Sequence, residues 1–202
     1  FKLDELRDSP NPQPISTFKT SGDTLAVWVD GDTVYLSDEG DGFQILDFGR
    51  IDTPAIAGKV EILGFDFQVV NGYAYVASGN LQIVDVRNRF KPEVVATVRT
   101  PGFAGGVKFR DGYVYLTDAE SGLYIIDASA PRQPQIVGRQ PVTGSARGLG
   151  VFPSLTSPPS PPLEGRGDRG GVTLAYVAAE GGGLQAIDVS QPSRPRWLNR
   201  YD

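Results

Sequence analysis

The sequence predicts an all-β protein, a β-propeller of four-stranded antiparallel blades with a repeat of about 40 residues and four blades present. Three observations predict this fold class. A tyrosine-containing string recurs along the chain, Gly-containing turn dipeptides punctuate the repeats, and no stretch keeps a 3.6-residue apolar period. Runs such as QIVDV are apolar on both faces, as expected of sheets that pack between neighbouring sheets.

The recurring string contains one central tyrosine and ends in one aspartate. Its copies are VYLSDEGDGFQILD (34–47), AYVASGNLQIVD (74–85), VYLTDAESGLYIID (114–127) and AYVAAEGGGLQAID (175–188). The equivalent tyrosines are Tyr35, Tyr75, Tyr115 and Tyr176, and the closing aspartates are Asp47, Asp85, Asp127 and Asp188. A proline follows each aspartate seven residues later, which favours an Asx-type turn toward an outer strand over a ring of functional carboxylates. We expect the tyrosines to pack in the core.

Each repeat divides into four strand-like runs. The first runs are LAVWV (25–29), DFQVV (66–70), GVKF (106–109) and GLGVF (148–152). In the first three repeats Asp-Gly or Asn-Gly follows, which predicts a tight hairpin to the second run, where the tyrosine lies. A short loop rich in Gly and acidic residues leads to the third run, which ends at the closing aspartate. The fourth runs follow the proline and are AIAGKVEI (55–62), EVVATVR (93–99), QIVGRQ (135–140) and RWLNRY (196–201).

These runs place residues 1–202 in one propeller domain. The expected blades are 21–62, 63–100, 101–140 and 141–202, and residues 1–20 are expected to end a preceding blade. In that first segment, FKLD (1–4) is similar to the tail of a third strand, and 9–20 to a Pro turn with a fourth strand. We therefore expect a piece of a larger propeller. The alternative is a small ring that the N-terminal strands close.

The last blade contains an insertion at residues 153–171, which includes SLTSPPSPPLEGRGDRGG (154–171). The last spacing between equivalent tyrosines is 61 residues where the others are 40, and the surplus falls between the first and second strands. Loop entropy grows slowly with length, so we expect a low-complexity loop there, on the face opposite the acidic turns. It contains Arg166-Gly167-Asp168, a receptor-adhesion tripeptide, but an accidental match in an Arg- and Gly-rich context is the favoured interpretation.

Composition excludes several function classes. The chain has no Cys, His or Met and carries a net charge of −5. Without His or Cys there is no Ser-His-Asp triad, no thiolate nucleophile and no imidazole or thiolate metal site, so only oxygen-ligand ions such as calcium stay open. No Lys/Arg run indicates a nucleic-acid partner, and no apolar run approaches the roughly 20 residues of a membrane span.

The acidic turns between the second and third strands form the candidate ligand face. In a propeller, these turns share a face with the blade-to-blade connections. The candidates there are Asp38, Asp41, Asp118, Glu120, Arg147 and Glu180. Paired carboxylates can hold calcium or perform acid/base chemistry on a glycan. Because the second blade offers only Ser78-Gly79-Asn80 at this place, the ring of acids is incomplete, and we assign no catalytic, cofactor-binding or metal residue.

Three segments carry a family resemblance: LQIVDV (81–86), LYIIDASAPRQP (123–134) and LQAIDVSQPSRP (184–195). They resemble the LVIVP-repeat β-propeller family, while FGRIDTP (48–54) departs from its pattern. The resemblance implies a surface or secreted protein of bacteria or archaea, hence an extracellular or cell-surface location, and it brings no common catalytic residues. The expected function is a non-catalytic scaffold that binds a protein or cell-surface partner. The alternative is a glycan-active enzyme or a glycan-binding propeller that uses the acidic residues.

Overall fold

A computed structural model describes residues 16–50, 52–154 and 172–201, and these ranges contain strands but no helix. The strands are β1 (Thr24–Asp30), β2 (Thr33–Asp38), β3 (Gly42–Asp47), β4 (Ala55–Val60), β5 (Asp66–Val70), β6 (Tyr73–Ala77), β7 (Leu81–Asp85), β8 (Glu93–Val98), β9 (Ala104–Arg110), β10 (Tyr113–Asp118), β11 (Gly122–Asp127), β12 (Gln135–Gln140), β13 (Ser145–Ser154), β14 (Val172–Glu180), β15 (Gly183–Asp188) and β16 (Arg196–Tyr201). Their order matches the four runs predicted for each repeat. None of the described residues belongs to a helix able to cross a membrane.

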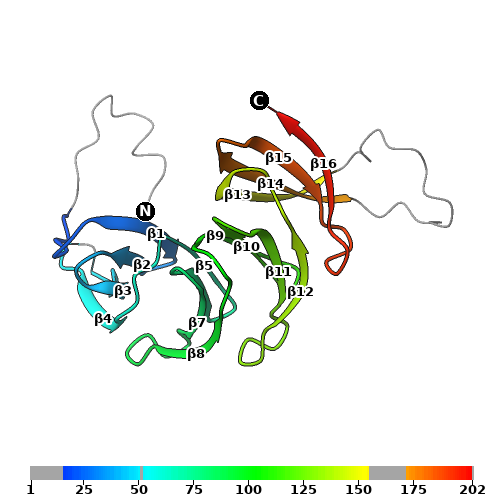
Figure 1. The fold of residues 1–202 in the computed structure, drawn as a ribbon. Helices are drawn as coiled ribbons and strands as arrows, with labels where there is room; N and C mark the ends of the chain where they lie inside the picture. Colours follow the sequence, from blue (N-terminus) through cyan, green and yellow to red (C-terminus); the bar gives the residue numbers. More distant parts are fainter. Residues whose placement is uncertain (1–15, 51, 155–171, 202) are drawn as a thin grey trace, which may run out of the picture.

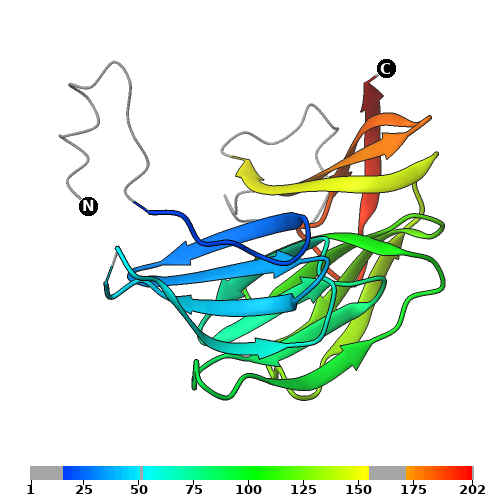
Figure 2. The ribbon, with the colours of Figure 1, turned by 90° about the vertical axis from the view of Figure 1, so that its left-hand side faces the viewer.

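The strands form four separate antiparallel sheets of four strands, one for each repeat. Each sheet takes its strands in chain order, so β1–β4, β5–β8, β9–β12 and β13–β16 are the four blades. The blades follow one another around an open arc, with β1, β5, β9 and β13 toward its centre (Figure 1). Figure 2 shows the first blade nearest the viewer and the other sheets behind it. The predicted fold class is therefore confirmed, with sheets that do not close into a ring.

Tight turns join the first two strands of the second and third blades, as the sequence predicts. Asn71 and Asp111 have φ values of 51° and 49°, and the glycine after each has a positive φ as well. Both central residues of a type I′ turn need this left-handed backbone, which Asn-Gly and Asp-Gly adopt at low cost. The turn chemistry therefore fixes the register of these two hairpins, and with it the side of the sheet on which each apolar residue lies.

Two predicted segments depart from the regular repeat: the insertion in the last blade and the N-terminal residues before the first blade. Pro153 and Ser154, which the sequence analysis placed in the insertion, instead pair with Thr173 and Val172 as the end of β13, at the opposite end of the blade from the β14–β15 turn. Residues 155–171, with Arg166-Gly167-Asp168, lie outside the described residues. Residues 16–20 form no strand, so the fourth strand predicted over 9–20 is wrong for its described part.

The core consists of apolar clusters between successive blades. Tyr35, Tyr75 and Tyr115 are buried in these clusters, so the core role predicted for the tyrosines is confirmed in three blades. The Tyr75 ring stacks on Phe109 of the next blade, with 4.7 Å between ring centroids. Tyr176 is only half-buried, because no blade of the described chain lies against that side of β14.

Neighbouring blades also meet backbone to backbone. A Cβ atom at Gly58 would lie 2.3 Å from the carbonyl oxygen of Arg89, and one at Gly138 would lie 2.0 Å from that of Pro192. Each contact joins the outer strand of one blade to the segment between the closing aspartate and the proline of the next blade. Glycine is required at these positions because any side chain would strike the neighbouring main chain.

Candidate functional site

The strands of the arc end on two faces. The connection face carries the turns between second and third strands together with the connections between blades. The Asp–Pro face carries the opposite hairpins and the segments from each closing aspartate to its proline. Hydrogen bonds show the arrangement of the connection face, where the Glu39 N–H donates to the Asp23 carbonyl at 3.1 Å and the Ala119 N–H to the Phe103 carbonyl at 2.9 Å.

Asp38 is buried on the connection face, and one of its carboxylate oxygens accepts hydrogen bonds from backbone N–H groups. Its Oδ1 accepts hydrogen bonds from the N–H groups of Gly22 (3.0 Å), Gly40 (2.9 Å) and Asp41 (3.0 Å). Gly22 belongs to the segment that enters the first blade, whereas the other two residues form the β2–β3 turn. The carboxylate therefore holds the entering chain against the turn, and we call this arrangement a turn clamp.

Asp118 forms the same turn clamp in the third blade. Its Oδ2 accepts a hydrogen bond from the Gly102 N–H at 2.9 Å, and its Oδ1 accepts from Glu120 (3.1 Å) and Ser121 (2.8 Å). Burial raises the pKa of the Asp118 carboxyl group, but the Thr100 hydroxyl and the three N–H groups lower it more, so the pKa lies below its ordinary value of 3.8. This carboxylate stays ionised and accepts three backbone hydrogen bonds, which suits a structural role.

The fourth blade uses an uncharged side chain for the same purpose. The Gln185 Oε1 accepts a hydrogen bond from the Thr143 N–H at 3.1 Å, and its Nε2 donates to the Thr143 carbonyl at 2.6 Å. In the second blade, the Ser78 N–H donates to the Asn80 carbonyl at 2.8 Å. The turn clamp is thus charged in the first and third blades and uncharged in the fourth, while the bond given for the second blade lies within its turn.

The other site residues predicted from the sequence do not lie together at one place. Asp41 accepts a hydrogen bond from the Ser21 N–H at 3.2 Å, and Glu120 is exposed on the third blade. Arg147 and Glu180 form an ion pair of 3.1 Å on the fourth blade, where both side chains are mostly exposed. In the described ranges, no three acidic side chains are grouped to share a metal ion.

An exposed pair of phenylalanines lies on the connection face beside the neutral turn of the second blade. We call Phe65 and Phe103 the aromatic patch. Their rings meet edge to face with 4.8 Å between centroids, and the residues are 37% and 43% exposed. The Phe65 N–H donates to the Ala77 carbonyl at 2.8 Å, which fixes the first of them against the second blade.

The second ring is positioned by a backbone bridge. Gly79 and Ala104 exchange two hydrogen bonds of 3.0 and 3.1 Å, and a Cβ at Gly79 would lie 3.7 Å from the Phe103 ring. The sequence analysis missed this patch because its two phenylalanines lie 38 positions apart, on different blade connections. A usable signal was a phenylalanine in each of the two connections that flank the shortest, uncharged turn.

On the Asp–Pro face, the closing aspartates make the Asx-type turns that the sequence predicts. Each accepts a hydrogen bond at Oδ1 from the N–H two residues ahead; the pairs are Asp47 with Gly49, Asp85 with Arg87, Asp127 with Ser129 and Asp188 with Ser190. The recurrence of aspartate is therefore explained by turn geometry.

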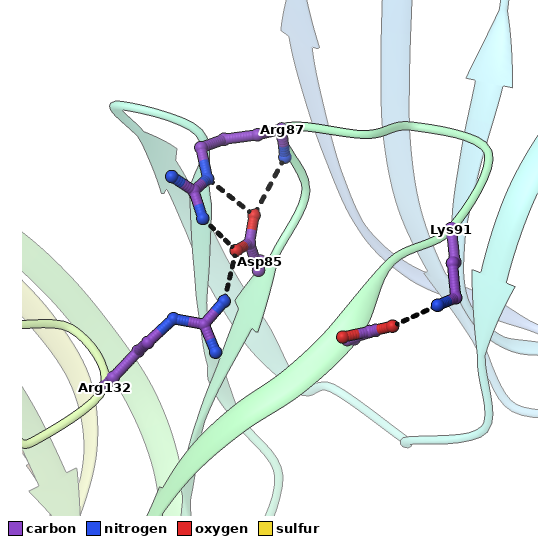
Figure 3. A network of polar contacts seen from close by, with 5 residues as sticks. Asp85, Arg87, Lys91 and Arg132 are labelled. Carbon is purple, nitrogen blue, oxygen red and sulfur yellow. Dashed lines mark hydrogen bonds and ion pairs between the residues drawn. The ribbon is translucent and has the colours of Figure 1, made fainter.

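Asp85 also anchors a polar network that reaches the next blade (Figure 3). The Arg87 Nε donates to its Oδ1 at 2.9 Å, and the Arg132 Nη2 of the third blade donates to its Oδ2 at 2.9 Å. The hydrogen bond from Arg87 is the main reason that the pKa of Asp85 falls to about 2. A second pair between blades joins Arg89 to Asp47 at 2.8 Å. The pairs of Arg132 with Asp85 and of Arg89 with Asp47 therefore connect neighbouring blades, and we call each of them a tie.

A hollow of about 410 Å³ lies beside this network and is lined by Asp85, Arg87, Asn88, Lys91 and Glu93. The Lys91 Nζ already pairs with the Glu93 Oε1 at 2.9 Å. The charged side chains that line the hollow are therefore paired with one another or with Arg132.

Comparison with solved structures shows the same architecture in other proteins. The computationally designed Ika4 protein has a TM-score of 0.62 at 9% identity, covering 87% of this chain and 98% of its own. The computationally designed Ika8 protein has a TM-score of 0.61 at 10% identity, covering 87% of this chain and 48% of its own. A protein of unknown function from Bacteroides thetaiotaomicron has a TM-score of 0.55 at 10% identity, covering 88% of this chain and 43% of its own.

This chain therefore spans about half the length of the Ika8 and Bacteroides chains. At such low identity, the likeness is one of fold alone. None of the curated proteins matches the chain.

The repeat itself identifies the family. A family model described as the LVIVD repeat matches residues 21–54, 65–100, 101–140 and 174–202. Each stretch lies within one blade, although the first ends before β4 and the last begins after β13, and together they cover more than half of the chain. They confirm the resemblance inferred from LQIVDV and its equivalents, although the family name differs in its last letter from the one used there. The chain belongs to the LVIVD-repeat family.

Proposed function

We propose that this propeller is a non-catalytic interaction module that binds a protein partner through the aromatic patch. The observation that carries the proposal is the edge-to-face pair of Phe65 and Phe103, exposed on the connection face. Aromatic side chains held on a rigid framework are common energetic centres of protein interfaces, because they bury much apolar area at little entropic cost.

The charges around the aromatic patch favour a partner with a basic rim. Glu120 lies against Gly102, next to Phe103, since a Cβ at that glycine would come within 2.8 Å of the Glu120 Cβ. Glu39 is exposed on the corresponding turn of the first blade. We therefore propose that the partner presents an apolar or aromatic side chain flanked by Lys or Arg. In keeping with the family resemblance, we propose that this contact occurs at the cell surface or outside the cell of a prokaryote.

The alternative, a glycan-active propeller, receives less support from the acidic residues. A general acid needs a raised pKa and access to substrate, whereas Asp118 is buried, has a lowered pKa and accepts three backbone hydrogen bonds. A glycan-binding role without hydrolysis uses the exposed rings instead, because sugars stack on aromatic faces. The same two phenylalanines therefore test both kinds of binding.

The experiment selects displayed peptides on the wild-type chain and measures their affinity for the wild-type chain and two variants. We expect F65A/F103A to weaken binding at least tenfold, consistent with the loss of two interface centres. Phe90→Ala is the matched control, because Phe90 is an exposed phenylalanine in the segment from Asp85 to the following proline, on the Asp–Pro face. It should leave affinity unchanged.

Selected peptides should carry an apolar side chain beside Lys or Arg. Equal affinity for wild type and F65A/F103A would contradict the proposal, as would a loss confined to variants of Arg87 and Arg132. A glycan array probed with the same proteins separates the alternative: binding of sugars, but of no peptide, that depends on the two rings would establish the glycan role.

A further inference from the structure

We propose that the first blade holds one buried water molecule between Asp38 and Gln44, next to the turn clamp. Both residues are 0% exposed. Five buried side-chain atoms in the described part of the chain lack a hydrogen-bond partner, and three of them belong to this pair: Asp38 Oδ2, Gln44 Oε1 and Gln44 Nε2. Buried polar atoms are normally hydrogen-bonded, so three unpaired atoms on two residues point to a bridging molecule. This site lies inside the blade and shares no residue with the aromatic patch.

The two side chains lie on the same side of the sheet. Asp38 pairs with Gly42, and Leu36 pairs with Gln44, across β2 and β3. Asp38 and Leu36 are two residues apart on one strand, so their side chains and that of Gln44 point to the same side. Asp38 and Gln44 are therefore diagonal neighbours, a spacing that long side chains can span.

The four blades fill these two positions with different pairs. The first position lies three residues after the central tyrosine, and the second lies three residues before the closing aspartate. The pairs are Asp38 with Gln44, Ser78 with Gln82, Asp118 with Tyr124, and Ala179 with Gln185. In the second blade the Gln82 Nε2 donates to the Ser78 Oγ at 3.0 Å, which shows that side chains at the two positions meet.

Of these pairs, that of the first blade combines a carboxylate with an amide. In the fourth blade, Gln185 holds the Thr143 main chain with both amide atoms. In the first blade, the Asp38 Oδ1 accepts a hydrogen bond from the Gly22 N–H and so already holds the entering chain. Gln44 is therefore not needed for the role of Gln185, and its amide stays buried on the same side of the blade as the second carboxylate oxygen.

The Asp38 Oδ2 can only accept hydrogen bonds at neutral pH. Burial raises the pKa of the Asp38 carboxyl group, but the Thr20 hydroxyl and three backbone N–H groups lower it more, so the pKa lies below its ordinary value of 3.8. The nearby Thr20 hydroxyl donates its hydrogen bond to the Gly22 carbonyl, with 3.1 Å between the oxygens. The second carboxylate oxygen therefore still needs a donor.

A water molecule matches the three unpaired atoms one for one. Its two O–H groups donate to Asp38 Oδ2 and Gln44 Oε1, while its oxygen accepts from Gln44 Nε2, and buried waters make about three such bonds. A sodium or calcium ion would bind the two oxygens but leave the amide N–H without an acceptor. Exchanging the amide oxygen and nitrogen leaves this count unchanged, because both atoms take part.

The water extends the turn clamp of the first blade to the third strand. The Asp38 Oδ1 joins the entering chain at Gly22 to the β2–β3 turn, and the water joins Oδ2 to Gln44 within β3. The third blade has no need of such a bridge, because both oxygens of Asp118 accept backbone hydrogen bonds directly.

The test counts long-lived water molecules in the folded chain by magnetic relaxation dispersion of the water oxygen. We expect Gln44→Leu, which removes the amide and keeps a side chain of similar size, to hold one long-lived water fewer than the wild type. Gln82→Leu is the matched control, because it changes the same repeat position where the amide bonds directly to Ser78, and it should leave the count unchanged. Circular dichroism verifies that both variants are folded.

A crystal structure of the wild-type chain tests the site without relying on a variant. We expect one water within hydrogen-bond distance of all three atoms. A direct hydrogen bond from Gln44 Nε2 to Asp38 Oδ2 without a water, or equal water counts in wild type and Gln44→Leu, overturns the proposal. A melting temperature that rises with added sodium or calcium in the wild type but not in Gln44→Leu also overturns it, since that response establishes a cation site.

Discussion

Replacing Asp118 by alanine should destabilise the protein strongly, although the residue lies in an acidic turn that looks like a ligand site. Three backbone N–H groups lose a charged acceptor, and each such hydrogen bond contributes about 1.5–3 kcal/mol when it is shielded from water. Water enters the vacated turn and offsets part of this loss. We therefore expect the free energy of unfolding to fall by about 3–5 kcal/mol, a large fraction of the stability of a typical domain.

The assay is urea unfolding followed by tryptophan fluorescence and circular dichroism. Glu120→Ala is the control, because Glu120 is an exposed acid two residues further along the same turn and should change stability by less than about 0.5 kcal/mol. The pKa of Asp118 is lowered in the folded state, so its contribution is complete above 3.8 and is lost as the pH falls through the folded pKa. The gap between wild type and Asp118→Asn should narrow over that acid range.

A loss below about 1 kcal/mol for Asp118→Ala, in a folded protein at neutral pH, would refute the turn clamp. A gap between wild type and Asp118→Asn that does not change with acid would refute the assignment of an ionised carboxylate.

Three further predictions test the contacts between blades. Gly138→Ala should cost about 3 kcal/mol in urea unfolding, because its Cβ would strike the main chain of the next blade at 2.0 Å, whereas Gly148→Ala, whose Cβ meets only a side chain at 3.4 Å, should be tolerated. Asp85→Asn should cost about 1 kcal/mol at pH 7 after allowance for solvent screening, and the difference should vanish as the pH falls from 3.8 toward 2, since the folded pKa is about 2. Tyr75→Ala should cost about 3–5 kcal/mol and Tyr176→Ala about 1 kcal/mol by the same assay, because only the first ring is enclosed by two blades.

Most of the fold could be predicted from the sequence because its signals are local. The spacing of tyrosine, aspartate and proline sets the blade, and Asn71-Gly72 and Asp111-Gly112 set the hairpins, so strand order follows without long-range information. The excess spacing before Tyr176 located the insertion for the same reason. The strand predicted over 9–20 rested on a proline and on analogy to a fourth strand, without a cross-strand partner to support it.

The site was less predictable, because it depends on contacts between blades. Asp38 and Asp118 look like exposed turn acids in DEGDG and DAESG, and only the approach of Gly22 and Gly102 buries them. The tie from Arg132 to Asp85 spans 47 residues and follows no motif. Local sequence patterns identify which residues form the turns, whereas packing between blades determines which of these residues are exposed to solvent.

The difference between charged and uncharged turn clamps has a consequence for how the connection face responds to acid. The first and third blades hold their entering chain with an ionised aspartate, and the fourth blade does so with the amide of Gln185, which does not titrate. Protonation should therefore loosen the turn clamps of the first and third blades, whereas the turn clamp of the fourth blade stays closed. Amide hydrogen exchange at low pH would then be faster at the clamped N–H groups of Gly22 and Gly102 than at that of Thr143.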